Sequence, residues 1–108
     1  MLPEGIWIGL GGNQAGSETA LRQAITRLAT LLPLQAVSSL YVTAPQDYLD
    51  QPDFLNAVAA FGFPDKGVDQ PSVLLEILLD MELDLGRNRH RPIAKGPRLI
   101  DLDLLLWG

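Results

Sequence analysis

Two aspartates near the end of the sequence have the type and spacing of a binding site. Asp101 and Asp103 stand two apart in a run of apolar residues that indicates a β-strand. Side chains two apart in a strand point to the same side of the sheet, so the two carboxylates share one face about 7 Å apart. Carboxylates placed in this way hold hard divalent cations through oxygen, and the pair is a candidate metal site.

The residues around the two aspartates decide between a metal site and an ordinary solvated strand face. A D-x-D pattern taken alone is most often the wet side of an edge strand. Here Leu105 and Trp107 continue the same face without polar groups. The opposite face, which we expect in the core, consists of Ile100, Leu102, Leu104 and Leu106. Two carboxylates in a strand that is apolar on both faces are costly to desolvate, which favours a bound ligand.

A basic segment leads into this strand. Five of the eight Lys and Arg residues lie between Arg87 and Arg98, and no acidic residue interrupts them. Positive side chains beside paired aspartates are what a magnesium–polyphosphate site requires. His90 lies in the same segment, but without a second His or a Cys it does not predict a transition-metal site.

Composition limits the class of protein and its partners. With 108 residues and 47% hydrophobic content, we expect one globular domain over residues 1–108. The absence of cysteine suits a reducing compartment, and we find neither a signal peptide nor a membrane-spanning run, so we expect a cytoplasmic protein. A net charge of −5 argues against nucleic-acid binding, so the basic segment predicts a small anionic ligand.

Periodicity predicts six elements in the order β-α-β-β-α-β. The expected strands are 6–10, 35–43, 54–61 and 99–107, with helices from Ser17 to Pro33 and from Pro71 to Gly86. We expect Ser17 to be the N-cap of the first helix and Gly86 to end the second. The expected core stripes of the helices are Leu21, Ala24, Ile25, Leu28 and Leu32, and Leu74, Leu78, Met81 and Leu85. This order is that of the ferredoxin-like α+β fold, with a four-stranded antiparallel sheet and two helices on one face.

A second group of candidates brackets the loop between the middle strands. Thr43 and Pro45 precede this loop, and Phe54 and Asn56 follow it. An aromatic face with a buried amide can hold a flat heterocycle that has hydrogen-bonding edges. The alternative, which residue types alone favour, is a core phenylalanine and an asparagine that satisfies a loop carbonyl. Glu82 on the second helix is, by residue type alone, a solvated position.

Taken together, the motifs resemble the 6-hydroxymethyl-7,8-dihydropterin pyrophosphokinase family of folate biosynthesis. The matching blocks are Gly11-Gly12-Asn13, Ser38-Ser39-Leu40-Tyr41, Thr43 with Pro45, Gln51-Pro52-Asp53-Phe54-Leu55-Asn56, Glu82 with Gly86-Arg87-Asn88-Arg89, and Gly96-Pro97-Arg98-Leu99-Ile100-Asp101-Leu102-Asp103-Leu104-Leu105. They extend over essentially the whole sequence, and the last block is the most specific.

The resemblance implies an activity and a role for each candidate residue. The activity is transfer of the β,γ-pyrophosphoryl unit of ATP to the hydroxymethyl group of the pterin, with two magnesium ions. By the resemblance, Asp101 and Asp103 hold both ions, and Arg87 and Arg98 are catalytic residues that contact the polyphosphate. Glu82, Arg87, Arg89 and Arg98 lie on the nucleotide side, while Thr43, Pro45, Phe54 and Asn56 hold the pterin.

The sequence also departs from the family pattern. Ala94 and Lys95 stand where many members carry a basic residue followed by tryptophan, and Gly12 stands where serine is common. The family continues past the last strand with a histidine and an arginine for the phosphates, adenine contacts and a second aromatic for the pterin. We therefore expect weak transfer and a homodimer that shields the last strand. The alternative is a non-catalytic ferredoxin-like module that binds pterin or nucleotide or associates with itself.

Overall fold

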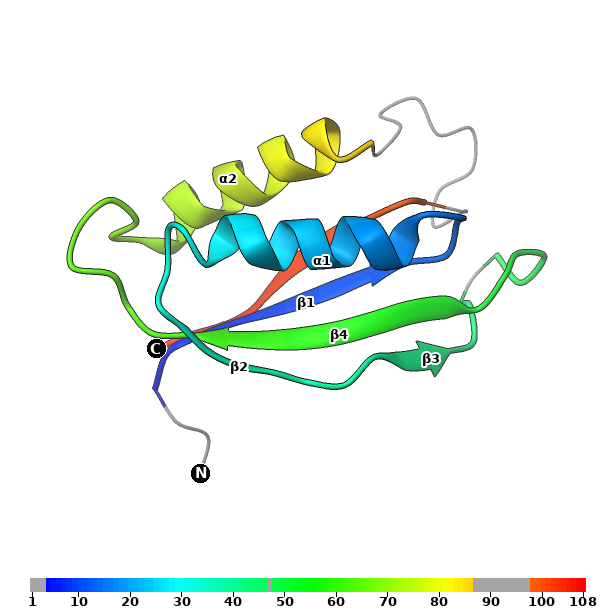
Figure 1. The fold of residues 1–108 in the computed structure, drawn as a ribbon, viewed down its shortest axis with the longest axis horizontal. Coiled ribbons are helices and arrows are strands. Elements are labelled where there is room, and N and C mark those ends of the chain that lie inside the picture. Colours follow the sequence, from blue (N-terminus) through cyan, green and yellow to red (C-terminus); the bar gives the residue numbers. More distant parts are fainter. Residues whose placement is uncertain (1–3, 47, 87–97) are drawn as a thin grey trace.

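Five strands and two helices form the part of the chain that this computed structural model describes, residues 4–46, 48–86 and 98–108. The helices, α1 (Ser17–Leu28) and α2 (Pro71–Asp84), cover the same face of the sheet (Figure 1). The strands are β1 (Ile6–Gly12), β2 (Leu34–Val37), β3 (Tyr41–Thr43), β4 (Phe54–Phe61) and β5 (Asp101–Trp107). The predicted order of elements is confirmed, except that the second predicted strand is divided in two.

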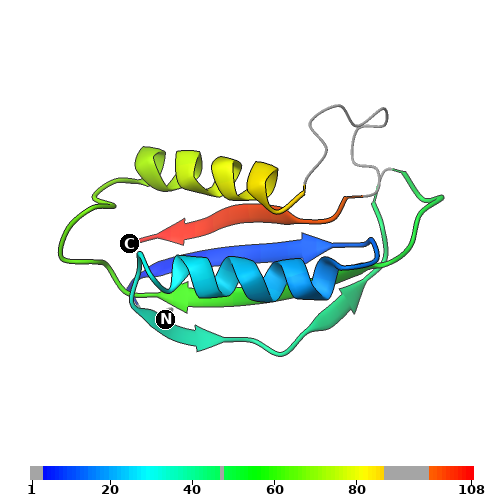
Figure 2. The ribbon, with the colours of Figure 1, turned by 45° about the horizontal axis from the view of Figure 1, so that its top comes forward.

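The sheet is antiparallel, with its strands in the order β2-β4-β1-β5, and β3 pairs with the opposite end of β4. In Figure 2, α1 lies over β1 and β4, and α2 runs along β5. This arrangement confirms the ferredoxin-like α+β class. It places β1 between β4, which carries Phe54 and Asn56, and β5, which carries Asp101 and Asp103.

The division of the predicted strand 35–43 corrects the expected count of four strands. β2 and β3 pair with the same strand, β4. The chain from β2 to β3 has one more residue than the stretch of β4 that lies opposite it. Ser38 N donates to Val58 O at 2.8 Å, and Val58 N donates to the Ser38 hydroxyl oxygen at 2.9 Å. The Ser38 side-chain oxygen thus accepts the hydrogen bond that a backbone carbonyl would accept in a regular strand pair, as at a β-bulge. The described residues therefore form five strands rather than four.

The core lies between the sheet and the helices and follows the predicted periodicities. In β1 every second residue is buried, whereas Trp7, Gly9 and Gly11 face the other side of the sheet. The predicted helix residues that are buried are Leu21, Ala24, Leu28, Leu32, Leu74, Leu78 and Met81, while Ile25 and Leu85 are half-buried. Burying each large side chain contributes about 1.5–3 kcal/mol, so this interface holds both helices on the sheet.

The helix ends agree only in part with the expectation from the sequence. α1 begins at Ser17, preceded by Gly16 with φ of 91°, so the prediction that Ser17 is the N-cap is wrong. The Ser17 hydroxyl instead donates to Leu99 O at 2.7 Å, which ties the start of α1 to the segment before β5. α1 ends at Leu28, before Pro33. Gly86 follows α2 with φ of 108°, as predicted for a glycine that ends a helix.

A register shift in β5 corrects one part of the predicted core. Ile8 pairs with Leu104 and Trp7 with Leu106, so Leu105 is an extra residue in β5. The shift interrupts the alternation of the strand, and Leu106 is 42% exposed instead of buried. The expectation that Leu106 faces the core was therefore wrong.

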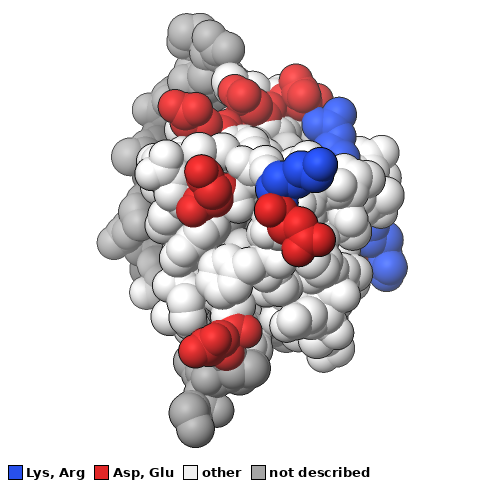
Figure 3. Space-filling view, turned by 90° about the vertical axis from the view of Figure 1, so that its left-hand side faces the viewer, with Lys and Arg blue, Asp and Glu red and all other residues white. Residues whose placement is uncertain are grey.

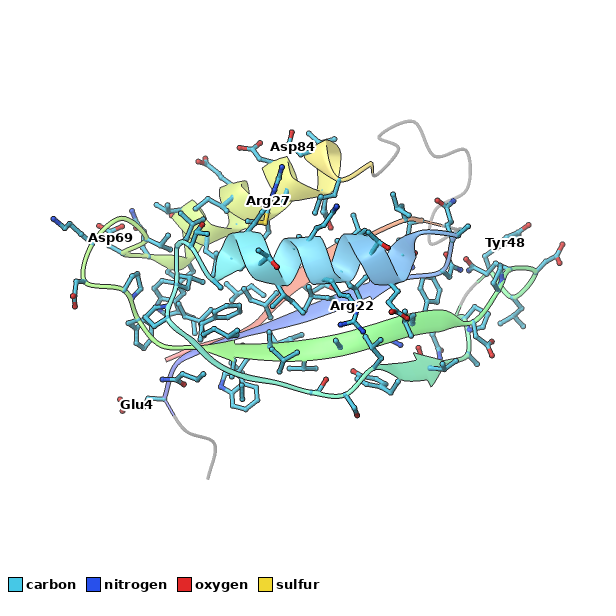
Figure 4. All side chains as sticks on the ribbon, viewed as in Figure 1. Glu4, Arg22, Arg27, Tyr48, Asp69 and Asp84 are labelled. Carbon is cyan, nitrogen blue, oxygen red and sulfur yellow. The ribbon has the colours of Figure 1, made fainter. Side chains whose placement is uncertain are left out.

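An ion pair joins the two helices on the outside of the molecule. Arg27 on α1 and Asp84 on α2 form an ion pair at 3.2 Å across the outside of the helices (Figure 4). Both are substantially exposed, so the pair contributes about 0–1 kcal/mol. At the end of the molecule seen in Figure 3, acidic side chains are scattered among uncharged ones. Across residues 4–46, 48–86 and 98–108, no helix is long and apolar enough to cross a membrane.

Candidate functional site

A pocket of about 320 Å³ opens on the face of the sheet opposite the core. Its walls come from β1, β3, β4 and β5 and from the loop after β3. The predicted site residues that line it are Thr43, Phe54, Asn56, Arg98, Asp101 and Asp103. The structure therefore brings the two predicted groups, the heterocycle side and the metal side, to the walls of one pocket.

Two glycines of β1 form the floor between these two sides. Gly11 pairs with Asn56 on β4 and with Asp101 on β5, and Gly9 pairs with Asp103. A Cβ atom at Gly11 would lie 3.1 Å from Asn56 Oδ1, closer than ordinary van der Waals contact allows. Glycine therefore keeps open the space between the amide of Asn56 and the carboxylates. Sequence reasoning missed this role because the run matches no known phosphate-binding pattern.

Asp101 and Asp103 lie on the same face of β5, as predicted, because each is paired with a pocket-facing glycine of β1. Asp103 is exposed, and the side chain of Asp101 is 30% exposed. Asp101 Oδ2 lies 3.6 Å from Arg98 Nε, an ion pair that is too long to be a hydrogen bond. The two carboxylates are thus accessible from the pocket, and among the described residues Arg98 lies beside Asp101.

Arg98 lies between the two sides of the pocket. Its guanidinium carbon is 4.6 Å from the centroid of the Phe54 ring, a cation–π contact, and its side chain is only 11% exposed. Within the described residues, the buried Nε of Arg98 has no hydrogen-bond acceptor. A buried N–H without an acceptor is costly, and the carboxylate of Asp101, at 3.6 Å, offsets this cost only in part.

Asn56 is held so that its amide nitrogen and oxygen have different roles. Nδ2 donates to Thr43 Oγ1 at 2.8 Å and to Phe54 O at 3.1 Å. The oxygen points over Gly11, towards the pocket. The sequence left open whether this amide satisfies a backbone carbonyl or faces a ligand. The nitrogen does the first, and the oxygen is placed for the second. Pro45 is half-buried between two pocket-lining residues but does not line the pocket itself.

Glu82 is buried, with 3% of its surface exposed, so the expectation of a solvated helix position was wrong. Its Oε2 accepts a hydrogen bond of 2.7 Å from the backbone nitrogen of Leu102. Leu102 stands between the two aspartates, and α2 therefore holds the strand that presents them. The described pocket is not lined by Glu82, and its role on the nucleotide side stays a prediction.

The remaining predicted residues of the basic segment fall outside the described part of the chain. Arg87, Arg89 and His90 belong to residues 87–97, which the structure does not describe. The predicted roles of Arg87 and Arg89 stay predictions.

Two further polar residues near the pocket were not predicted as site residues. Asn13 follows β1 and is buried, and its side chain bonds to Gln51 in the loop before β4. Both appear in the sequence motifs, but nothing in their local pattern distinguishes them from ordinary turn residues. Burial of a polar side chain marks a residue with a specific role, and Asn13 is only 8% exposed. This burial comes from segments that are distant in the sequence, so no local pattern reveals it.

The two carboxylates of the pocket suit a magnesium ion that also binds the oxygens of a phosphate ligand. Among the described residues, no group of three or more His, Cys, Asp or Glu side chains is arranged to hold a metal ion. Magnesium usually keeps several waters and is bound by one or two carboxylates together with substrate phosphates. Asp101 and Asp103 fit that pattern, since the phosphate oxygens would complete the coordination.

Comparison with known proteins supplies an independent line of evidence. Residues 7–108 match the family model described as 7,8-dihydro-6-hydroxymethylpterin-pyrophosphokinase. The chain is 40% identical over 103 residues to a Bacillus subtilis protein and 38% identical over 105 residues to a Pseudomonas aeruginosa protein. Both are named 2-amino-4-hydroxy-6-hydroxymethyldihydropteridine pyrophosphokinase. These matches cover 94% and 95% of this chain but 58% and 61% of the relatives, so the chain spans about three-fifths of their length.

Proposed function

The chain belongs to the 7,8-dihydro-6-hydroxymethylpterin-pyrophosphokinase family, and we propose that it transfers a pyrophosphoryl group from ATP to 6-hydroxymethyl-7,8-dihydropterin. The observation that carries this proposal is the shared pocket, in which Phe54 and Asn56 face Asp101 and Asp103 across a glycine floor. A heterocycle bound on one side has its substituent directed toward phosphates bound on the other.

On the pterin side, we propose that Phe54 and Asn56 bind the ring. Phe54, which lines the pocket with 9% of its surface exposed, supplies an aromatic contact, and Asn56 Oδ1 offers an acceptor to the N–H groups along the ring edge. Thr43 accepts from Asn56 Nδ2 and so keeps the amide oxygen directed at the pocket. Thr43 acts here through Asn56, while Pro45 shapes the loop beside it.

On the nucleotide side, we propose that Asp101 and Asp103 hold two magnesium ions with the polyphosphate. Ions held there would neutralise the charge of the phosphates. Arg98, which lines the pocket beside Asp101, donates to a phosphate oxygen from its guanidinium group. Arg87, Arg89 and Glu82 are proposed to complete the nucleotide side.

The reaction needs little covalent chemistry from the protein. A bond forms between the hydroxymethyl oxygen and the β-phosphorus, and the bond from that phosphorus to the bridging α,β-oxygen breaks. AMP leaves, and the hydroxyl proton is lost to solvent. Fixing the two reactants at contact distance and neutralising the phosphates supply most of the rate enhancement in such transfers.

AMP release is the test of this proposal. We expect slow AMP formation that requires ATP, Mg²⁺ and hydroxymethyldihydropterin together. AMP formation at the same rate without the pterin would contradict the proposed acceptor. Binding of both ligands by calorimetry with no AMP at all would instead identify a non-catalytic binding module.

We also propose that two copies of the chain associate in the cytoplasm through the end of β5 that lies away from the pocket. Leu106, which does not line the pocket, is 42% exposed there and pairs with the half-buried Trp7. A second copy would remove this apolar surface from water. Light scattering at high concentration tests the proposal, which a strictly monomeric mass would contradict.

A further inference from the structure

Tyr41, which the proposed chemistry does not use, is the more exposed of two aromatic residues among the described lining of the pocket. It is paired with Asn56 across β3 and β4, and 44% of its surface is exposed. Phe54, the other aromatic, is 9% exposed, and the guanidinium of Arg98 lies over its ring at 4.6 Å. A flat ligand in this pocket would therefore meet most of the free aromatic surface on Tyr41.

The direction of the Tyr41 side chain depends on the extra residue between β2 and β3. Val37 pairs with Ala59, which is fully buried on the helix side, whereas Tyr41 pairs with Asn56 on the pocket side. In an unbroken strand, residues four apart point to the same face of the sheet. If the pairing of β2 continued without the extra residue, Tyr41 would lie opposite Leu55 and point towards the helices.

Ser38 holds the extra residue in place. Its backbone nitrogen donates to Val58 O at 2.8 Å, and its hydroxyl oxygen accepts from Val58 N at 2.9 Å. The same hydroxyl donates to Ser39 O at 2.9 Å. A β-bulge beside a binding site commonly redirects a side chain, and the hydroxyl of Ser38 supplies the hydrogen bonds that close this one.

We propose that Tyr41 is a ligand-binding residue on the pterin side, turned into the pocket by the bulge at Ser38, and that its ring packs against the heterocycle. The inference rests on the proposed function for the identity of the ligand. Tyr41 and Phe54 lie diagonally across β3 and β4, a spacing of about 7–8 Å that lets one flat ring contact both. Asn56, opposite Tyr41, would meet the polar edge of the same ring.

The first experiment compares the wild type with Tyr41→Phe, Tyr41→Leu and the control Val42→Ala. Val42 is the next residue on β3, is 64% exposed and pairs with Leu55, so it points away from the pocket. Fluorescence titration measures the affinity for hydroxymethyldihydropterin. Tyr41→Phe keeps the ring and should stay within about threefold of the wild type, as should Val42→Ala, whereas Tyr41→Leu should bind about fivefold or more weakly.

The affinity for a Mg²⁺-bound non-hydrolysable ATP analogue without pterin separates a ligand contact from a structural role. It should change less than about twofold in every variant, because Tyr41 is proposed to contact the pterin alone. Wild-type pterin affinity in Tyr41→Leu, or an equal loss of pterin and nucleotide binding, would overturn the role of Tyr41.

The second experiment tests whether Ser38 positions Tyr41. Ser38→Ala removes the acceptor for Val58 N, and Ser38→Thr keeps a hydroxyl in its place. We expect Ser38→Ala to speed hydrogen exchange of the Val58 amide more than tenfold and to weaken pterin binding at least about threefold, with both restored in Ser38→Thr. Unchanged pterin affinity in Ser38→Ala would overturn the role of the bulge.

A measurement without ligand separates this inference from the proposed function. Nuclear Overhauser contacts between the Tyr41 ring and the Asn56 side-chain amide should be present in the wild type and weaker in Ser38→Ala. Their absence in the wild type would show that Tyr41 does not face the pocket. Wild-type protein that shows these contacts but binds no pterin would instead contradict the proposed function, and with it the assignment of the pterin to Tyr41.

Discussion

Glu82 Oε2 lies 2.7 Å from the backbone nitrogen of Leu102, the residue between Asp101 and Asp103. Among the described strands, β5 is at the edge of the sheet and pairs with β1 alone. The carboxylate on α2 therefore bonds to the side of β5 that no strand covers. A buried helix side chain is thus bonded to the strand that presents the two aspartates.

Replacing Glu82 tests whether this hydrogen bond fixes the strand. Glu82→Gln keeps an oxygen acceptor, whereas Glu82→Leu leaves the buried Leu102 N–H unpaired. We expect Glu82→Leu to lower the free energy of unfolding by about 1–3 kcal/mol more than Glu82→Gln, as measured by urea denaturation. Equal stability of the two variants would show that the bond to Leu102 N contributes nothing.

Replacing the two aspartates tests the metal side of the pocket. Asp101→Asn and Asp103→Asn keep the shape of the side chain and remove its charge. Each should weaken binding of the Mg²⁺–nucleotide by at least about 1–2 kcal/mol, measured by titration calorimetry. Asp69→Asn, the same change on an exposed residue in the loop before α2 (Figure 4), is the matched control and should leave the affinity unchanged. A double variant at 101 and 103 that binds like the wild type would rule out the assignment.

Replacing Arg98 separates its charge from its packing. Arg98→Lys keeps a positive charge but loses the planar group that covers Phe54. We expect Arg98→Lys to weaken nucleotide binding about tenfold and Arg98→Ala to weaken it further. Because the side chain is largely buried, Arg98→Ala should also lower the melting temperature, whereas the exposed Arg22→Ala should not. Wild-type nucleotide affinity in Arg98→Ala would make Arg98 a purely structural residue.

The glycine floor gives a prediction with a control in the same strand. A Cβ at Gly11 would press on Asn56 Oδ1 at 3.1 Å, whereas one at Gly9 would meet the flexible Leu105 side chain at 3.4 Å. Gly11→Ala should therefore weaken pterin binding at least about tenfold, and Gly9→Ala should change it less than about threefold. Fluorescence titration with the pterin measures both. If the two variants behave alike, the floor does not set the distance to Asn56.

The elements that local sequence determines were predicted well. A continuous apolar run interrupted only by Asn56 predicts β4 at 54–61, and Pro71 with Gly86 marks the limits of α2, because these signals act within a few residues. The shared face of Asp101 and Asp103 follows from strand periodicity in the same way. These predictions needed no knowledge of which segments meet in space.

The features that were predicted wrongly or not at all depend on contacts between distant segments. The extra residue at Leu105 arises from pairing with β1, and the division at Ser38 arises from pairing with β4. The burial of Glu82 depends on the unpaired edge of β5, which no pattern within α2 reveals. The contact of Arg98 with Phe54 joins residues more than forty positions apart in the sequence.

The most direct test of the central claim, that one pocket holds the pterin and the Mg²⁺–polyphosphate side by side, is a paramagnetic relaxation measurement. Mn²⁺ replaces Mg²⁺ in the complex with a non-hydrolysable ATP analogue and the pterin, and the NMR signals of the pterin and of the Asn56 side-chain amide are followed. We predict strong broadening of both signals in the wild type and its loss in the double variant Asp101→Asn, Asp103→Asn. Sharp pterin signals in the wild-type complex, with both ligands bound, would contradict the account.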